Sequence, residues 1–304
     1  MLEKCILCDG EFGCVVNLEN ALRYRQCKEC EAFLQASSSN VLEDFERSQE
    51  EYFNGDPTEV FAEPTPLFNE RWTYRERLCR NYLIEKSTVL EVGPGSGVLA
   101  QILEKNDFNY TGCEHSPSFS DYLRDKGLKI YTGSFENSQV IKFKEDFDAI
   151  ISMHIIEHLP DPQKHLARAY EVVKPGGVMI LCTPNSKSIY HKLPDKFASN
   201  FDEAHLFVFS PASIIHMARN AGWVVENVMT HEYTSDWLRL ISRMLRLLKG
   251  ENAGSTAGKY SKQANNPSTG KVITIICLLS APLRWLQSRL GVGNEINVVL
   301  RKPR

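Results

Sequence analysis

Three glycines at alternate positions give one short stretch the means to bind a polar ligand. Residues 87–97 read STVLEVGPGSG, an apolar run followed at once by Gly93, Gly95 and Gly97. Glycine lets a ligand approach the backbone without meeting a Cβ, and a turn between a strand and a helix offers its N–H groups. A nicotinamide fingerprint needs G-x-G-x-x-G, but position 98 is Val, and the phosphate-loop ending G-K-[ST] is absent. The pattern that remains is acid-x-G-x-G-x-G, which starts at Glu91.

Four cysteines near the N-terminus have the spacing of a metal site. Cys5 and Cys8 form one C-x-x-C pair, Cys27 and Cys30 form another, and 18 residues separate the pairs. Two such pairs about 15–20 residues apart are typical of zinc sites, because each pair can direct both thiolates at one tetrahedral Zn²⁺. Residues 1–36 are too few to bury much core, so we expect a zinc-ribbon-like module in which a structural zinc supplies the folding energy.

Composition excludes several broad classes. The chain has 304 residues, a formal net charge of −3 and a pI of about 6.3. No global basic field favours a nucleic-acid partner. The first ten residues, MLEKCILCDG, contain no apolar signal core, and no uncharged apolar run reaches the roughly 18 residues of a spanning helix. Nine cysteines in an otherwise ordinary composition do not indicate a disulfide-rich secreted protein, so we expect a reducing, cytoplasmic compartment.

Strands and helices alternate along the rest of the chain, which predicts an α/β fold with a doubly wound, mostly parallel sheet. Seven strands are expected, at 88–92, 110–113, 129–132, 147–153, 178–183, 223–229 and 296–300. Helices are expected at 67–86, 119–126, 162–173 and 211–220. The predicted domains are the module at 1–36, a linker or lid segment at 37–66, and a domain at 67–304 that carries a helical insertion at 232–292.

Four motifs in order carry a family resemblance. They are EVGPGSG at 91–97, Glu114 at the end of the second strand, FDAIISMHIIEHLPDP at 147–162 and KPGGVMILCTPN at 174–185. From about residue 67 to 230, plus the last strand, the chain resembles the class I S-adenosylmethionine (SAM) methyltransferases. EHLPDP, TPN and HLFVFSP at 205–211 are most similar to the ubiquinone O-methyltransferase-like group. The resemblance implies a Rossmann-like seven-stranded sheet whose seventh strand is antiparallel.

The resemblance also assigns cofactor contacts. The glycine turn would hold the methionine tail of SAM, and Glu91 would bind its ammonium group, directly or through water. Glu114, 23 residues beyond Glu91, would accept both ribose hydroxyls. Ser134 and Phe135, after the third strand, are candidates for the adenine edge and face, and Met153 would line the pocket.

Methyl transfer to a hydroxyl needs alignment and the removal of one proton. The candidate bases are His154, His158 and His205, and His158 is favoured because the Glu157-His158 step follows the fourth strand. Each histidine could instead have a capping or packing role. The ubiquinone-type enzymes are thought to bind a metal ion with an acid-rich version of this segment, and His154 stands where they have an acid.

The insertion between strands six and seven has the composition of an interfacial anchor. Residues 237–249 form a basic amphipathic helix, and 272–283 are an apolar run too short to span a bilayer. Because a parallel sixth strand ends at the carboxyl edge of the sheet, the insertion should lie on the substrate side. Two interpretations remain: peripheral contact of 237–249 and 272–289 with the inner face of a membrane, or packing on the protein itself or on the second subunit of a homodimer.

The sequence thus predicts SAM-dependent O-methylation of a small-molecule or glycan acceptor that could be lipid-linked, as in polysaccharide biosynthesis. One alternative is C- or N-methylation of a nucleotide sugar or natural product. Nucleic-acid methylation is disfavoured by the acidic pI and by HIIEHLP where N-P-P-[YF] would be expected. A zinc-ribbon adaptor with an inactive methyltransferase fold is disfavoured because the cofactor positions look intact.

Overall fold

The computed structural model of the chain describes residues 4–17, 22–36, 66–137, 142–143, 146–192, 200–201, 204–248 and 267–304. The predicted linker or lid segment lies outside these residues except for its last position. Among the described residues, no helix is long and apolar enough to cross a membrane.

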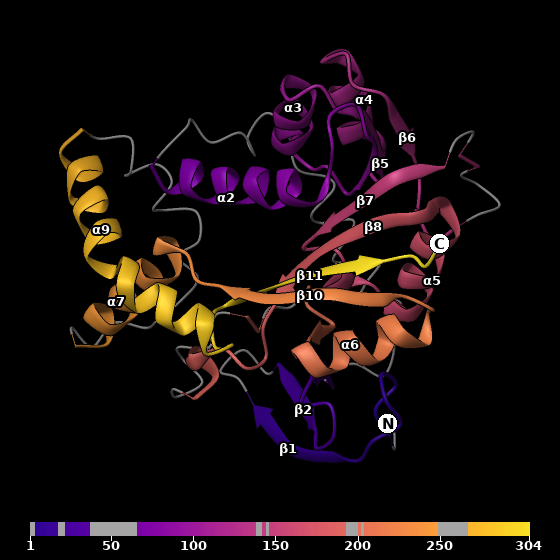
Figure 1. Cartoon of the computed structure of the whole chain (residues 1–304). Helices are drawn as coiled ribbons and strands as arrows, with labels where there is room; N and C mark the ends of the chain where they lie inside the picture. Colours follow the sequence, from indigo (N-terminus) through magenta and orange to yellow (C-terminus); the bar gives the residue numbers. More distant parts are fainter. Residues whose placement is uncertain are drawn as a thin grey trace.

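A seven-stranded sheet forms the centre of the molecule (Figure 1), with the order β10-β11-β8-β7-β4-β5-β6. Its strands are β4 (Thr88–Val92), β5 (Asn109–Glu114), β6 (Ile130–Thr132), β7 (Phe147–Met153), β8 (Val173–Pro184), β10 (Val224–His231) and β11 (Glu295–Arg301). The pairs from β6 to β8 are parallel, whereas β11 is antiparallel to both of its neighbours. The predicted doubly wound sheet with an antiparallel last strand is confirmed.

Alternate side chains of the central strands feed two cores, as a sheet covered on both faces requires. Leu90 and Ile150 belong to one core, and their neighbours Val89 and Ile151 belong to the other. Helices α2 (Pro66–Tyr82), α3 (Val98–Lys105) and α4 (Pro117–Asp125) supply the second core, and α5 (Pro162–Val172) and α6 (Pro211–Asn220) supply the first.

Local sequence explains where several helices begin. Ser116, Asp161 and Ser210 each accept a hydrogen bond from a backbone N–H of the first helical turn, and Pro follows each of them. One boundary differs from expectation, because β8 starts at Val173 and not at residue 178, where the sequence predicts its first residue. Phe147 pairs with Val173 across a register shift, so the glycines of that segment lie within an irregular strand.

A second sheet, which the sequence did not predict, joins the N-terminal module to the main domain. It has the order β1 (Phe12–Asn17), β2 (Arg23–Cys27), β3 (Phe33–Gln35) and β9 (Phe207–Val208), and every pair is antiparallel. A strand of two residues leaves no readable alternation in a sequence, which is why β9 escapes prediction. The module lies on the face covered by α5 and α6 (Figure 1) and shares their core.

The insertion forms two helices, α7 (Thr234–Leu248) and α9 (Pro267–Arg289), between β10 and β11. Helix α7 begins just after β10, and α9 ends just before β11, both at the carboxyl edge of the parallel strands. There α9 contacts α2, α7 and β10. The expected position of the insertion on this side of the sheet is confirmed (Figure 1).

Candidate active site

The glycine turn between β4 and α3 combines two close backbone contacts with one open position. All three glycines have positive φ, namely 68° at Gly93, 52° at Gly95 and 73° at Gly97. A Cβ on Gly93 would lie 2.2 Å from Ile155 Cδ1, and one on Gly97 would lie 2.5 Å from Leu123 Cδ2. A Cβ on Gly95 would meet nothing within 4 Å. Gly95 therefore faces open space, in which a ligand could contact the backbone.

Glu114, at the end of β5, is tied directly to this turn. Its Oε2 accepts a hydrogen bond from the N–H of Gly95 at 3.3 Å, and its Oε1 accepts one from the N–H of Ser116 at 3.0 Å. The side chain is buried, and this burial raises the pKa of the carboxyl above its ordinary value. Hydroxyl donors from a ribose would therefore further stabilise the ionised form of this carboxyl, which already accepts hydrogen bonds from backbone N–H groups.

Glu91 lies below the turn in a buried position. Tyr110 Oη donates a hydrogen bond to Glu91 Oε2 at 2.8 Å. Burial raises the pKa of Glu91 to about 7, against the opposing effects of the Tyr110 hydrogen bond and the charge of Arg75. Glu91 thus changes charge near neutral pH. An ammonium group placed beside it would lower its pKa, because the positive charge favours the carboxylate.

Ser134 and Phe135 face different surroundings. Ser134 Oγ donates to Glu136 Oε2 at 2.7 Å, and His165 Nδ1 lies 2.7 Å from Glu136 Oε1. Phe135 is 2% exposed and belongs to the core. Met153 ends β7, half-buried beside the second core.

The structure brings Glu91, the glycine turn and Glu114 together. The adenine and pocket roles of Ser134, Phe135 and Met153 stay predictions.

His154 is held between two carboxylates. Its φ is 57°, and its Nδ1 and Nε2 lie 3.1 Å from Glu157 Oε1 and 2.7 Å from Glu295 Oε2. These hydrogen bonds raise the pKa of His154 against the opposing effect of burial. Because both ring nitrogens face carboxylate oxygens, the geometry fits a doubly protonated ring that donates at both nitrogens. A ring in this state has no lone pair with which to accept a proton. The position favours a structural role, in which His154 keeps Glu157 and Glu295 together.

Two further partners of this cluster have no recognisable signal in the sequence. Arg75, on α2, is 6% exposed, and its Nη2 lies 3.5 Å from Glu295 Oε2. Tyr233 Oη donates to Glu295 Oε1 at 2.9 Å. The pKa of Glu295 is well below its usual range, because the hydrogen bond and charge of His154, together with the charge of Arg75, outweigh burial. Glu295 stands in the sequence as a single acid directly before the apolar strand expected at 296–300, and this position does not reveal its partners.

His158 and His205 form a pair with one free nitrogen each. His158 Nδ1 lies 2.8 Å from the carbonyl of Ala204, and His205 Nδ1 lies 2.8 Å from the carbonyl of Asn200. Each Nδ1 must carry the proton, so each Nε2 keeps its lone pair. The ring centroids are 4.8 Å apart, and burial lowers the pKa of His158. A neutral imidazole with a lone pair at this edge of the sheet can accept a proton.

Glu157 completes this cluster. It is fully buried, and Thr183 Oγ1 donates to its Oε2 at 3.0 Å. Glu157, His158 and His205 each offer one ligand atom, and the three atoms lie within 4.8 Å of one another. Two imidazole nitrogens and a carboxylate are a donor set for a divalent transition metal, and backbone carbonyls already orient both rings.

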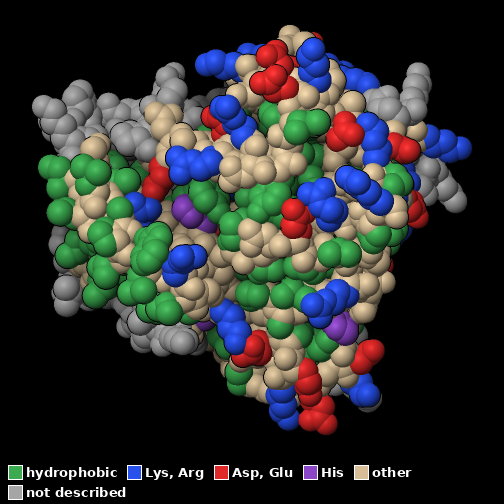
Figure 2. Space-filling view, viewed as in Figure 1, with side chains coloured by type: hydrophobic (Ala, Val, Ile, Leu, Met, Phe, Trp, Pro, Cys, Tyr) green, Lys and Arg blue, Asp and Glu red, His purple; other side chains and the backbone are tan. Residues whose placement is uncertain are grey.

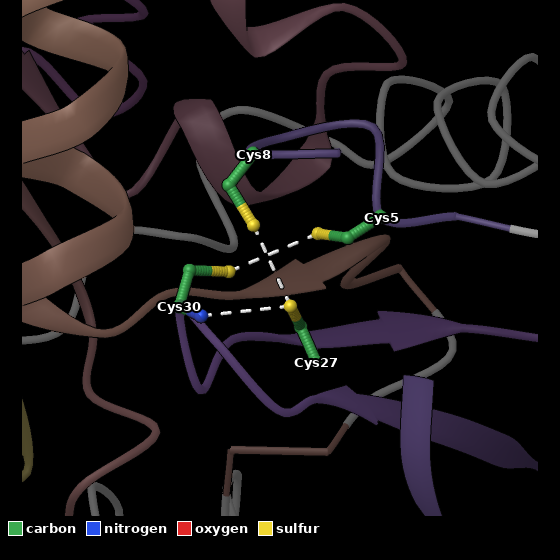
Figure 3. A group of neighbouring side chains, drawn as sticks. All are labelled: Cys5, Cys8, Cys27 and Cys30. Carbon is green, nitrogen blue, oxygen red and sulfur yellow. Dashed lines mark hydrogen bonds between the residues drawn. The ribbon is translucent and has the colours of Figure 1, made fainter. Parts of the chain in front are cut away.

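The four N-terminal cysteines converge on one point (Figure 3), where they could hold a metal ion. Cys5 Sγ lies 3.8 Å from Cys30 Sγ, and Cys8 Sγ lies 3.5 Å from Cys27 Sγ. Tetrahedral coordination with Zn–S bonds of about 2.3 Å places sulfurs about 3.8 Å apart, so the observed spacing fits zinc. No sulfur of this group forms a disulfide.

The two C-x-x-C loops have the same backbone geometry. Asp9 N–H donates to the carbonyl of Cys5 at 2.8 Å, and Glu31 N–H donates to the carbonyl of Cys27 at 3.1 Å. Asp9 and Glu31 both have positive φ, at 59° and 57°. Two equivalent knuckles therefore present the four sulfurs, although the sequences around them differ.

The cysteine module also fixes the backbone beside His205. Tyr24 Oη donates to the carbonyl of His205 at 2.7 Å, and Gln35 N–H donates to the carbonyl of Leu206 at 2.9 Å. On the other side, Leu206 N–H donates to the carbonyl of Glu157 at 2.9 Å. The segment that carries His205 is thus held between the module and the turn that carries Glu157 and His158.

Comparisons with known proteins agree with this geometry. A family model described as a methyltransferase domain matches residues 69–228, which are 160 of the 304 residues. The ubiquinone biosynthesis O-methyltransferase of Histophilus somni is 27% identical over 213 residues, or 63% of this chain and 86% of that protein. The protein of the same name from Coxiella burnetii is 33% identical over 101 residues, and the match spans 32% of this chain and 43% of its own length.

Solved structures show the same fold. A SAM-dependent methyltransferase from Archaeoglobus fulgidus has a TM-score of 0.51 at 16% sequence identity, and the match covers 84% of this chain and 99% of that one.

Proposed function

Because the chain belongs to the methyltransferase domain family and is a SAM-dependent methyltransferase, we propose that it methylates a hydroxyl group of a small-molecule acceptor. The observation that carries this proposal is the 2.8 Å contact between His158 Nδ1 and the carbonyl of Ala204, which leaves a lone pair on Nε2. The imidazole is half-buried, and desolvation lowers its pKa, which favours the neutral form. A hydroxyl must lose its proton during methylation, and a fixed, neutral imidazole is suited to take it. The ubiquinone O-methyltransferases found among the relatives support an acceptor of this class.

The cofactor half of the reaction would rest on the glycine turn. The open face at Gly95 and the buried acceptor on Glu114 fit a ligand that brings a ribose and a polar tail. SAM, when bound there, supplies a methyl group on a positively charged sulfur. The role of the protein would be to bind SAM and the acceptor and to orient them for methyl transfer. Alignment of the reacting atoms alone can provide much of the rate acceleration.

Proton removal at the acceptor would fall to His158, with His205 as the neighbouring group. The carbonyl of Ala204 fixes the proton of His158 on Nδ1, so Nε2 accepts. Glu157 lies beside the pair and would stabilise the imidazolium formed on proton transfer.

A divalent cation bound by Glu157, His158 and His205 is a second candidate for this step, since the three ligand atoms lie within 4.8 Å. Such a cation would lower the pKa of a bound hydroxyl and occupy both Nε2 lone pairs. The two candidates differ in one measurement. Activity that is lost in a chelator and restored by Mn²⁺, Co²⁺ or Zn²⁺ supports the cation, whereas activity that resists chelation supports His158 as base.

Acceptor class is tested by incubating the protein with SAM and matched panels of phenols, glycans and nucleotide sugars, and detecting the methylated product by mass spectrometry. Methyl ethers of phenols are the expected products. Transfer to glycans alone would favour the polysaccharide interpretation, and transfer to carbon or nitrogen of a nucleotide sugar would contradict O-methylation. Calorimetry with SAM tests the adaptor alternative, which requires that no binding occurs.

For the N-terminal module we propose one structural zinc per chain, held by Cys5, Cys8, Cys27 and Cys30. The sulfur spacing and the two matching knuckles support this assignment. Metal analysis of the purified protein should find one equivalent of zinc, and a metal-free protein with all four thiols reactive would contradict it.

A further inference from the structure

Helix α9 has its polar and apolar faces reversed relative to a helix that packs on a soluble domain. Ser280 and Arg284 point inward and are only 6% and 8% exposed. Large apolar side chains point outward, with Leu278 70%, Leu279 76% and Trp285 62% exposed. A helix on a water-facing surface normally buries its apolar stripe and exposes its charges.

The inward face of α9 is fixed by hydrogen bonds. Arg284 Nε donates to Ser280 Oγ at 3.0 Å, and its Nη1 reaches the carbonyl of Glu232 at 3.2 Å and forms an ion pair with Glu70 on α2. Rotating the helix to bury its leucines would take Arg284 away from Glu70 and leave this half-buried carboxylate, with an 18% exposed side chain, without its cation. That loss is costly in a low-dielectric site, so the apolar face stays outward.

Helix α7 extends the same surface. Ile241, Met244 and Leu245, at positions i, i+3 and i+4, are 40–54% exposed, and α7 packs beside α9. We call these residues the apolar patch, together with the outward residues of α9, namely Ile275, Leu278, Leu279, Leu283, Trp285 and Leu286. Figure 2 shows hydrophobic side chains gathered over α7 and α9, at the left of the view. A contiguous apolar surface of this kind marks an interaction site.

Charge around the apolar patch has one sign. The sequences of α7 and α9 contain a single acid, Asp236, which is buried and lies 3.8 Å from Arg239. Arg243 belongs to α7, and exposed Arg289 stacks over the ring of Trp285, with 5.5 Å between its Cζ and the ring centroid. An interfacial anchor has apolar residues that enter the acyl boundary, a tryptophan at the interface and basic residues beside it. The apolar patch and its arginines have these features.

We propose that the apolar patch docks on the surface of a lipid bilayer that contains anionic lipids. An anionic surface complements the arginines, and each contributes attraction near the headgroups. A two-fold dimer would place the patch against its own copy and bring like charges together, because an isologous interface pairs the same surface with itself. In this arrangement α7 and α9 would lie along the interface, with the apolar patch toward the acyl boundary. The docking does not depend on methyl transfer.

Flotation with vesicles tests the proposal on the full chain. Wild-type protein should float with phosphatidylcholine vesicles that contain phosphatidylglycerol, and less so at high salt, because salt screens the attraction. Serine at Leu278, Leu279 and Leu283 should lower the bound fraction by about tenfold or more. The matched control is Ile84→Ser, because Ile84 is 81% exposed but lies outside the apolar patch. The control should float like the wild type.

Three results would overturn the proposal. The first is wild-type protein that stays at the bottom of the gradient with the phosphatidylglycerol-containing vesicles, even at low salt. The second is equal flotation of the triple variant and the wild type. The third is a wild-type dimer, measured by light scattering, that the same substitutions convert to monomers while neither protein floats with vesicles. This result would assign the apolar patch to contact with a second copy of the chain. SAM affinity, measured in each variant, separates loss of docking from loss of fold.

A second measurement needs no multiple variant. Trp285 is the most exposed tryptophan, whereas Trp223 is buried. Brominated lipids in the anionic vesicles should quench part of the wild-type fluorescence, and Trp285→Phe should remove that quenched part. If the brominated lipids quench the fluorescence of Trp285→Phe as much as that of the wild type, another surface contacts the bilayer and the proposal is wrong.

Discussion

The carboxyl edge of the sheet has two halves that are assembled in opposite ways. The cofactor half consists of Glu91, the glycine turn and Glu114, which lie within residues 91–114 on neighbouring strands. The acceptor half consists of His154, Glu157, His158, His205 and Glu295, and its hydrogen bonds join residues up to 141 positions apart. One half is a single continuous motif, and the other exists only after distant segments have packed.

This difference separates two kinds of function. The cofactor half presents backbone N–H groups and buried carboxylates, whose geometry follows from one β-α-β unit. The acceptor half depends on the cysteine module and on the insertion, both of which the minimal fold lacks. Damage to the cofactor half should therefore appear in SAM affinity, and damage to the acceptor half should appear in turnover with SAM affinity retained.

The largest expected effect tests the acceptor half directly. His158→Ala should lower kcat by about 10²–10⁴-fold, as is typical when a general base is lost, while the Kd for SAM stays within twofold or so of wild type. Calorimetry and a methyl-transfer assay measure the two quantities. The matched control is His216→Ala, because His216 is exposed on α6 and bonds only Asn220 there. A fully active His158→Ala variant would move the role to His205.

The next effect asks whether the cysteine module belongs to the acceptor half. Cys27→Ser should release the proposed zinc and free the backbone of His205 from Tyr24, so kcat should fall by about 10²-fold if the ring moves by about 1 Å. SAM affinity should be unchanged, which also reports that the main domain is folded. Cys14→Ser is the control, since Cys14 is exposed and outside the cluster. Parallel losses of SAM affinity and turnover would erase the distinction between the halves.

The third effect tests the cofactor half. Glu114→Ala should weaken SAM binding at least tenfold, because each charge-assisted hydrogen bond to a ribose hydroxyl is worth roughly 1.5–3 kcal/mol. Turnover at saturating SAM should change much less. Glu104→Ala, an exposed carboxylate on α3, serves as the control. Unchanged affinity in Glu114→Ala would end the assignment of Glu114 to the ribose.

The smallest effect concerns pH. Burial raises the pKa of Glu91 to about 7, so this carboxylate, which we predict to bind the ammonium group of SAM, is largely protonated below that value. One pH unit below the pKa leaves about a tenth of the carboxyl ionised, so SAM affinity should fall roughly tenfold from pH 8 to pH 6. Glu91→Gln should bind more weakly and lose this step. A step of the same size in Glu91→Gln would assign the titration to another group.

The same shift affects stability with a definite sign. The folded protein binds a proton on Glu91 between about pH 4.5 and 7 that the unfolded chain has released. The free energy of unfolding of the cofactor-free protein should therefore fall as pH rises through this window, and Glu91→Gln should flatten the curve, as denaturant titrations at each pH would show.

Sequence reasoning succeeds where neighbours in space are neighbours in the chain. The strand expected at 88–92 and the helix expected at 211–220 depend on local signals, and β4 and α6 have these bounds. The spacing of the cysteines is also a local signal, and the four sulfurs lie close together. The order of the motifs then identified the sheet and its antiparallel last strand.

It fails where a side chain gains its meaning from a distant partner. The fixed state of His154 depends on Glu295, and the inward face of α9 depends on Glu70, which is 214 positions from Arg284. The pairing of β9 with β3 involves only two residues of each strand. No periodicity or composition carries information about such contacts, because they are decided by tertiary packing.

The pairing of β3 with β9 also sets an order of events during synthesis. Tyr24 waits for a partner that is 181 residues farther along the chain, and ribosomes add about 5–20 residues per second, so the interval is roughly 9–36 s. Throughout it, the first-made module has an open strand edge that can recruit another nascent chain. Metal capture at the proposed zinc site would keep this early module compact, and we then expect the metal supply during translation to affect how much of the protein aggregates.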